Sequence, residues 1–161
     1  HKNIVQLLLN HSERIDLNAR YITGYTPLLW ACRKGHIDVV QLLLNYSKRI
    51  DLNARDDWKE KTAFMWACFK GHNDVVQLLL KQSDRNIDLN ARDYHGNTAL
   101  MLACNRGYKI VVQSLLEHSD PRIDLIAKDN NGQTALMEAS ERGHQDIVQL
   151  IKMFSVKINI L

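Results

Sequence analysis

Proline, glycine and long hydrophobic runs are scarce in this chain. It has 2 Pro and 7 Gly among 161 residues, which excludes collagen-like and proline-rich sequences. No stretch approaches the roughly 18–20 apolar residues that a transmembrane helix needs, so we expect no membrane insertion. Hydrophobic residues nevertheless make up 45% of the chain and charged residues 24%, which is typical of a folded protein and excludes a disordered one.

Cysteine and net charge are also low. Lys and Arg number 21 against 18 Asp and Glu, and this small excess does not make nucleic acid the expected partner. Three cysteines are too few, and odd in number, for a disulfide scaffold, which favours a reducing compartment. We therefore expect an intracellular, cytoplasmic protein, with the reservation that a chain beginning within a motif can have lost a leader.

What the chain has in abundance is repetition. The glycines Gly35, Gly71, Gly107 and Gly143 lie 36 residues apart, as do the threonines Thr26, Thr62, Thr98 and Thr134. The run Val-Val-Gln-Leu-Leu-Leu at 39–44 returns with small changes at 75–80, 111–116 and 147–151, and a copy stands at 4–9. Asp-Leu-Asn-Ala-Arg stands at 16–20, 51–55 and 88–92, and becomes Asp-Leu-Ile-Ala-Lys at 124–128. Self-similarity at this period predicts a stack of small structural units.

Each unit is predicted to contain two helices. Thr26 can cap the first helix through its hydroxyl, and Pro27 suits the first helical position. Gly35 ends this helix in the left-handed conformation, which glycine adopts without a Cβ clash. The second helix carries apolar residues at helical spacing over 39–44. A two-helix unit cannot bury both of its apolar faces alone, so neighbouring units must stack into an elongated solenoid.

Three motifs together resemble the ankyrin repeat. They are Gly-Tyr-Thr-Pro-Leu at 24–28, Ala-Cys-Arg-Lys-Gly-His at 31–36 and Asp-Leu-Asn-Ala at 51–54. The resemblance covers essentially the whole chain and implies an all-α ankyrin-type solenoid of helix-turn-helix repeats with short β-hairpin-like turns. By that pattern a single array fills 1–161, with a partial repeat at 1–20, repeats at 21–55, 56–92 and 93–128, and a C-terminal repeat at 129–161. The resemblance also implies binding of another protein through a concave face, built from the hairpin tips and the first helices.

The sequence departs from the ankyrin pattern in three ways. Its units are longer, because the loop after the second helix is extended. Apolar residues replace the histidine that follows Thr-Pro-Leu in the family, namely Leu29, Met65, Met101 and Met137. Glu60 stands where a turn glycine is expected, with one extra residue nearby, so we predict a different hairpin tip in the 56–92 unit.

The cysteines recur at one register position, as Cys32, Cys68 and Cys104. Adjacent packed helices lie roughly 8–10 Å apart, which is too far for a shared metal ion or a disulfide. We therefore predict buried packing roles for the thiols, with no metal and no other cofactor.

Catalytic chemistry is not indicated. Histidines follow three of the repeat glycines, at 36, 72 and 144, and this recurrence indicates a role in starting the second helix. No Ser/His/Asp or Cys/His trio is brought together by the repeat, and no phosphate-binding glycine loop is present. We expect no catalytic residues and no enzyme; a site completed by segments outside the chain is the alternative.

Positions that vary between units are free for recognition. Aromatic residues concentrate in the units at 21–55 and 56–92, and a basic row of Lys34, Lys70, Arg106 and Arg142 runs along the array. Aromatic and arginine side chains are enriched at binding hot spots. The predicted partner-binding residues are Tyr25, Trp30, Arg33, Lys34, Trp58, Trp66, Phe69, Lys70, Tyr94, Asn105 and Arg106. We expect a partner protein or peptide anchored over the aromatic residues, with its acidic residues facing the basic row. The alternative is that Trp30 and Trp66 pack between helices.

Two further basic columns accompany this row. They are Arg20, Arg55, Arg92 and Lys128, and then Arg14, Arg49, Arg85 and Arg122. Each lies near a repeated aspartate such as Asp51 or Asp88, which predicts exposed ion pairs worth at most about 1 kcal/mol each. A phosphate- or lipid-binding face is the alternative.

Three asparagines stand in a shared acidic–aliphatic–Asn context: Asn18, Asn53 and Asn90. In ankyrin repeats this context resembles the site of asparagine hydroxylation. Hydrogen bonding within the turn is the alternative role.

The first residues resemble a second helix whose first-helix partner is not in the sequence. Its apolar residues, Ile4, Val5, Leu8 and Leu9, would lack their natural cover, so we expect fraying or a contact with another molecule through this uncapped helix. The sequence as a whole predicts a protein-binding module. The alternative is a structural spacer or scaffold segment that contacts mainly its own chain.

Overall fold

A computed structural model describes residues 3, 6–7, 15–82, 87–117 and 123–157. The predicted helix pairs are present. The first helices of the units are α2 (Pro27–Lys34), α4 (Ala63–Lys70), α6 (Ala99–Arg106) and α8 (Ala135–Glu141). The second helices are α3 (Ile37–Leu44), α5 (Asn73–Leu80), α7 (Lys109–Glu117) and α9 (Gln145–Lys157), and a 3₁₀ turn, η2 (Ser47–Arg49), follows α3. The apolar positions expected to fray or make a contact near the N-terminus lie outside the described residues.

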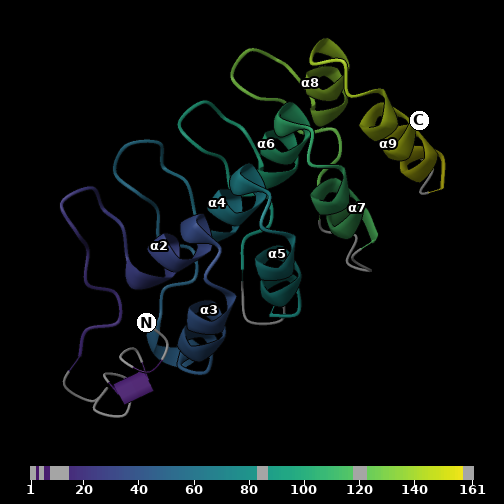
Figure 1. Ribbon diagram of the computed structural model, residues 1–161. Helices are drawn as coiled ribbons and strands as arrows, with labels where there is room; N and C mark the ends of the chain where they lie inside the picture. The colour runs from purple at the N-terminus through teal and green to yellow at the C-terminus, as the bar shows by residue number, and fades with distance from the viewer. Residues whose placement is uncertain (1–2, 4–5, 8–14, 83–86, 118–122, 158–161) are drawn as a thin grey trace.

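The helices form two layers (Figure 1). The first helices stack in one layer, each packed against the next, and the second helices stack in the other. Long loops join the units and extend beyond the first-helix layer. Within the described residues there is no strand, only an isolated antiparallel bridge between Arg55 and Thr62. The all-α solenoid predicted from the sequence is confirmed, whereas the boundaries of the individual repeats stay a prediction.

All four first helices start by the same local chemistry, and α2, α4 and α6 also end by the same local chemistry. Threonine hydroxyls cap the N-termini; the Thr62 oxygen, for example, accepts a hydrogen bond from the backbone N–H of Met65 at 3.2 Å. At the C-terminus of α4, Gly71 has a φ of 75° and donates its N–H back to the last turn. Only glycine takes this conformation without steric strain. Capping therefore fixes both ends of an eight-residue helix that would be unstable alone.

The hairpin-like turn of the 56–92 unit differs from the others, as predicted. The N–H of Asp93 donates to the carbonyl of Asn97 at 3.0 Å, four residues ahead, whereas the N–H of Asp56 reaches five residues ahead to Lys61, at 3.1 Å. The extra residue forces Glu60 into a left-handed conformation with a φ of 55°, the only positive φ at a non-glycine position among the described residues.

The cysteines are buried and free, as predicted for packing residues. Burial raises the pKa of the Cys104 thiol to about 12, and the Glu138 carboxylate acts in the same direction. Burial also raises the pKa values of Cys32 and Cys68. Each thiol is therefore held in its neutral form in the first-helix layer.

Of the four residues that replace the family histidine, three are packed in the core. Leu29, Met65 and Met101 are buried, but Met137 is exposed. The sulfur of Met101 also accepts a hydrogen bond from the N–H of Thr98 at 3.4 Å. The thioether thus supplies part of the polar contact that a histidine would make.

Polar ladders join one unit to the next, and they correct our view of the basic column at Arg20. Its arginines do not pair with the repeated aspartates. Arg20 donates instead to the backbone carbonyl of Arg55 at 3.0 Å, and Arg55 donates to that of Arg92 at 2.5 Å. Exposed ion pairs do form, but with Asp57 and Glu60. Because the spacing between stacked units matches the reach of a guanidinium group, the arginines bond to the equivalent residue one unit ahead.

The asparagines form a second ladder. The side-chain oxygen of Asn18 accepts from the N–H of Asp51 at 2.8 Å, and that of Asn53 accepts from the N–H of Asp88 at 2.9 Å. Asn90 makes the same contact with Asp124 at 2.9 Å. The hydrogen bonds of these amides therefore link neighbouring units, rather than closing a turn within one unit.

Candidate functional site

Four aromatic side chains from adjacent units form one continuous row, which we call the aromatic row: Tyr25, Trp30, Trp66 and Phe69. The ring of Tyr25 lies 5.5 Å from that of Trp30 and 6.0 Å from that of Trp66. The rings of Trp66 and Phe69 are 5.6 Å apart and nearly perpendicular. Such edge-to-face contacts stabilise aromatic pairs beyond the area they bury. The structure thus brings together the aromatic residues that the sequence proposed as anchors on α2 and α4.

Arg33 is held at the centre of this row. Its guanidinium carbon lies 5.4, 5.3 and 5.0 Å from the ring centroids of Tyr25, Trp30 and Trp66. The Nε atom is buried and has no hydrogen-bond partner among the described residues. Burial raises the pKa of Tyr25, with the Arg33 charge opposing this shift and Asp56 adding to it. Arg33 is therefore an ordered cation with unused hydrogen-bonding capacity.

Phe69 is a second platform for positive charge. Arg106 lies 4.3 Å from its ring centroid, Lys70 lies 5.5 Å away, and Lys61 lies 5.6 Å away. Lys34 makes a similar contact with Trp30, at 5.1 Å. We call Arg33, Lys34, Lys70 and Arg106 the cationic set. None of the four forms an ion pair with a carboxylate of the described chain.

Trp66 requires a correction, because it is not a surface residue. Its exposed fraction is 7%, whereas that of Trp30 is 46%. The indole N–H of Trp66 donates to the buried carboxylate of Asp56 at 2.8 Å. Both tryptophans occupy the same register position, but α2 covers Trp66, and no described helix packs on Trp30 in the same way. The alternative that these tryptophans pack between helices is therefore correct for Trp66, whereas Trp30 remains accessible.

The predicted residues outside the two sets are dispersed. Trp58 and Tyr94 are 79% and 64% exposed at the hairpin tips, where Trp58 contacts Lys59 and Tyr94 contacts His95. Asn105 lies farther along the face and donates to Glu138 at 2.5 Å. Among the described residues no ring contact joins Trp58 or Tyr94 to the aromatic row, whereas Asn105 lines a groove together with Trp66 and Phe69.

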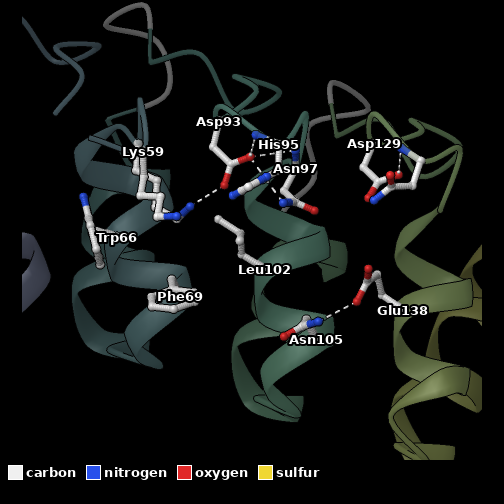
Figure 2. Close-up of a pocket in the computed structure, with 12 residues that line it drawn as sticks. Lys59, Trp66, Phe69, Asp93, His95, Asn97, Leu102, Asn105, Asp129 and Glu138 are labelled. Atoms are coloured by element: carbon white, nitrogen blue, oxygen red, sulfur yellow. Dashed lines mark hydrogen bonds and ion pairs between the residues drawn. The ribbon is translucent and has the colours of Figure 1, made fainter. Parts of the chain in front are cut away.

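A groove of about 380 Å³ continues from the aromatic row toward α8. Figure 2 shows its walls, formed by α4, α6, α8 and the hairpin turns above them. Between α4 and α6, the buried ammonium of Lys61 forms an ion pair with Asp93, whose other oxygen accepts from the N–H groups of His95 and Asn97 at 3.0 and 2.9 Å. Asp93 thereby fixes its own hairpin turn and connects it to the preceding unit.

The buried aspartates of the groove were missed in the sequence, although a signal was present. Aspartates recur at one register position, 56, 93 and 129, directly before each hairpin turn. Each is buried, and each accepts hydrogen bonds from backbone N–H groups of its own turn. A recurring acid in a turn predicts such a cap. The cation that reaches Asp93 from another unit has no such local signal.

The histidines that follow the repeat glycines were expected to help start the second helices, and they do so only in part. His36 and His72 stand at the N-caps of α3 and α5, but neither side chain caps its helix. The ring Nε2 of His72 bonds instead to the carbonyl oxygen of Arg33, in the preceding unit, at 3.2 Å. This contact holds the C-terminal end of α2 in place, next to the residue that carries the guanidinium.

The described part of the chain also bears on metal binding and on membrane insertion. There, no three His, Cys, Asp or Glu side chains are placed to hold a metal ion. No helix found there is both long and apolar enough to cross a bilayer.

Comparison with known families agrees with the architecture. The model of a family described as ankyrin repeats (3 copies) matches residues 1–93 and 83–160. No curated protein matches the chain. Ankyrin repeats are protein–protein interaction modules. The matched residues span nearly the whole chain, and the stacked helix pairs have the expected threonine and glycine caps. The chain therefore belongs to the ankyrin-repeat family.

Proposed function

We propose that this protein binds an acidic segment of a partner protein on the face formed by the aromatic row and the cationic set. The observation that supports this most is the absence of internal carboxylate partners: four cations stack on aromatic rings, and no described carboxylate forms an ion pair with them. Arginine and aromatic side chains in contact are typical of binding hot spots. A partner carboxylate can pair with the half-buried guanidinium of Arg33 through charge-assisted hydrogen bonds.

The surface contacts are expected to come from exposed or half-buried members of the two sets. Trp30, Arg33 and Phe69 are accessible, whereas Trp66 is buried and packs against its neighbours in the row. An alanine at Trp66 would therefore test folding rather than binding. Trp58 and Tyr94 stay proposed contacts at the hairpin tips, where a longer partner would reach them.

The proposal is tested with a displayed library of random peptides. We expect the wild-type protein to enrich peptides rich in Glu and Asp. The variant Lys34→Gln/Lys70→Gln/Arg106→Gln should lose this enrichment, because it removes three cations from the proposed face.

The matched control is Lys48→Gln/Lys81→Gln/Lys152→Gln. These lysines are exposed and lie on or next to η2, α5 and α9, away from the first-helix layer. Both triple variants lower the formal charge equally, from +3 to 0. Equal loss in both would mean that the peptides respond to net charge and not to this face, and enrichment without acidic residues would contradict the proposal directly.

A structural spacer is the second candidate, and one observation favours it. A hollow of about 650 Å³ lies beside Tyr21, Tyr25 and Trp30 on the outer side of α2. At the equivalent position in the next unit, Trp66 is covered by a preceding first helix, so the Trp30 surface could receive another unit of the same kind. Tyr21 lines this hollow, is 69% exposed and belongs to neither the aromatic row nor the cationic set. Tyr21→Lys should abolish such stacking while leaving the library selection unchanged if the two roles are separate, and size-exclusion chromatography with light scattering would show it.

Hydroxylation of Asn18, Asn53 and Asn90 remains a proposal that rests on the family context. A hydroxyl on Cβ would leave the amide oxygens in the ladder between units. Peptide mass spectrometry of protein from its native cell would show one added oxygen on these residues, and unmodified peptides throughout would refute it.

The cytoplasmic location also stays a prediction, which fractionation of the native cell would test.

A further inference from the structure

The end of the groove between α6 and α8 contains two carboxylates without a cation. Asp129 is only 8% exposed. Its Oδ1 accepts from the N–H groups of Asn131 and Gln133, both at 2.8 Å, whereas no donor of the described chain bonds to its Oδ2. Glu138 accepts from the amide of Asn105 through Oε2 and forms no ion pair with any described residue. Both carboxylates line the groove (Figure 2).

The preceding unit shows what is lacking here. Asp93 occupies the same register position as Asp129, and its Oδ2 is paired with the ammonium of Lys61. One unit later, the position of Lys61 is occupied by Asn97. The Asn97 amide is short and donates back to Asp93 at 3.3 Å. Among the described residues, a cation is thus supplied between α4 and α6 but none between α6 and α8.

We infer that this end of the groove is a subsite for a lysine or arginine side chain of the partner segment. The inference rests on the proposed function, because it places the subsite on the same face. The Oδ2 of Asp129 has no donor among the described residues, and an entering ammonium or guanidinium would take beside it the place that Lys61 takes at Asp93. The side-chain oxygen of Asn105, whose amide nitrogen donates to Glu138, offers a further acceptor.

An organic cation fits this end of the groove better than a metal ion does. Among the described residues, no three His, Cys, Asp or Glu side chains converge as metal ligands would. The lining also includes the apolar side chain of Leu102 on α6, which suits the methylene stem of a long basic side chain.

The partner is then bipolar, with acidic residues over α2 to α6 and a basic residue at α8. Arg33 on α2 and Glu138 on α8 are separated by three helix-to-helix steps, or about 24–30 Å. An extended peptide covers this distance in about eight residues. The partner segment is thus defined by charge order and spacing, not by acidity alone.

The test uses labelled synthetic peptides that contain a pair of glutamates and one lysine. The lysine lies about eight residues from the glutamate pair. Each peptide has a twin in which acetyl-lysine replaces lysine, so that shape is kept and the charge is lost. Both chain orders are made, because charge does not fix the direction of the peptide. Fluorescence anisotropy should show about tenfold tighter binding of the lysine peptide than of its twin, in at least one order.

Variants locate the effect. Glu138→Gln should remove the advantage of lysine and leave the affinity of the acetyl-lysine twin unchanged. Asn97→Lys should also remove the advantage of lysine while both acids stay in place, because it puts a lysine at the register position of Lys61. Its added positive charge should not weaken binding of the acetyl-lysine twin. Glu141→Gln is the matched control: it makes the same change on the same helix, but Glu141 bonds to Gln133 and does not line the groove.

The outcomes separate the two proposals. If neither peptide binds, the proposed acidic-peptide function is refuted. If the lysine peptide and its acetyl-lysine twin bind equally well, the proposed acidic-peptide function stands and the basic subsite is refuted.

A direct measurement decides the subsite independently of the peptides. In ¹H–¹⁵N NMR titrations with N-acetyl-lysine methylamide, the side-chain amide of Asn105 should shift in a saturable way in the wild type and in Glu141→Gln, but not in Asn97→Lys. Calcium chloride serves as the competing probe. A saturable shift with calcium and none with the lysine compound would overturn the inference in favour of a metal site.

Discussion

The stability of this protein should fall steeply between pH 8 and pH 10, because its three thiols are buried in one row. Each thiol has an ordinary pKa of 9.0, and burial raises this value in the folded state, to about 12 for Cys104. In this pH range the unfolded chain releases the three thiol protons while the folded chain retains them. A state that releases protons is favoured as pH rises, so the contribution of the thiols to the free energy of unfolding is lost as pH rises past 9.

The magnitude follows from how far the pH exceeds the ordinary pKa of the thiols, because the folded thiols stay protonated in this range. At pH 10 each unfolded thiol is one pH unit above its ordinary pKa, which stabilises the unfolded state by about 1.4 kcal/mol. Three thiols together give about 4 kcal/mol. The marginal stability of a folded chain is about 5–15 kcal/mol, so this loss is a large fraction of the total. The pKa of Tyr25 is also raised, but from an ordinary value of 10.0, so most of its effect comes above this range.

Urea unfolding followed by circular dichroism at pH 8, 9 and 10 provides the measurement. Each single Cys→Ala variant should lose about one third of the pH dependence, and the triple variant should lose nearly all of it. Ser155→Ala is a control, because Ser155 is buried and does not titrate. It should lower stability by a similar amount at every pH. A triple cysteine variant with the full alkaline loss would refute the assignment to the thiols.

Three further predictions concern single positions. Gly107→Ala should lower the free energy of unfolding by about 1–3 kcal/mol more than Gly143→Ala does. An added Cβ at Gly107 would lie 2.6 Å from the His144 ring, whereas one at Gly143 meets nothing. Equal losses of stability by urea unfolding would refute the clash. Glu60→Gly should stabilise the protein by about 1 kcal/mol by relieving the left-handed backbone, provided that the exposed ion pair of Glu60 contributes little, and a lower melting temperature would contradict this. Trp66→Phe should cost about 1–3 kcal/mol by leaving a buried carboxylate without its indole donor, and an unchanged urea midpoint would show that the bond is dispensable.

The fold was predictable because its signals are local. Thr62 and Gly71 each act within one helical turn, so the bounds of α4 can be derived from a short stretch of sequence. The recurrence of these caps every 36 residues then requires stacking, since one helix pair leaves an apolar face open. Even the unusual turn at Glu60 was visible as a residue out of register.

The cluster that we propose as a binding face was predictable only in part. Aromatic and basic residues at variable positions correctly identified a cluster on α2 and α4, because the repeat places equivalent positions side by side. Register alone could not distinguish Trp30 from Trp66, since their exposure depends on whether a preceding helix covers them. Nor could it show that Arg33 stacks on three rings.

The sequence by itself therefore determined the unit, its caps and the solenoid, since each depends on residues a few positions apart. The tertiary structure alone decided which side chains reach between units: Arg20 bonds to a carbonyl and not to a repeated aspartate, and Lys61 pairs with Asp93. These contacts join residues more than thirty positions apart. Their geometry depends on how closely stacked helices approach each other, and no local pattern of residues encodes that distance.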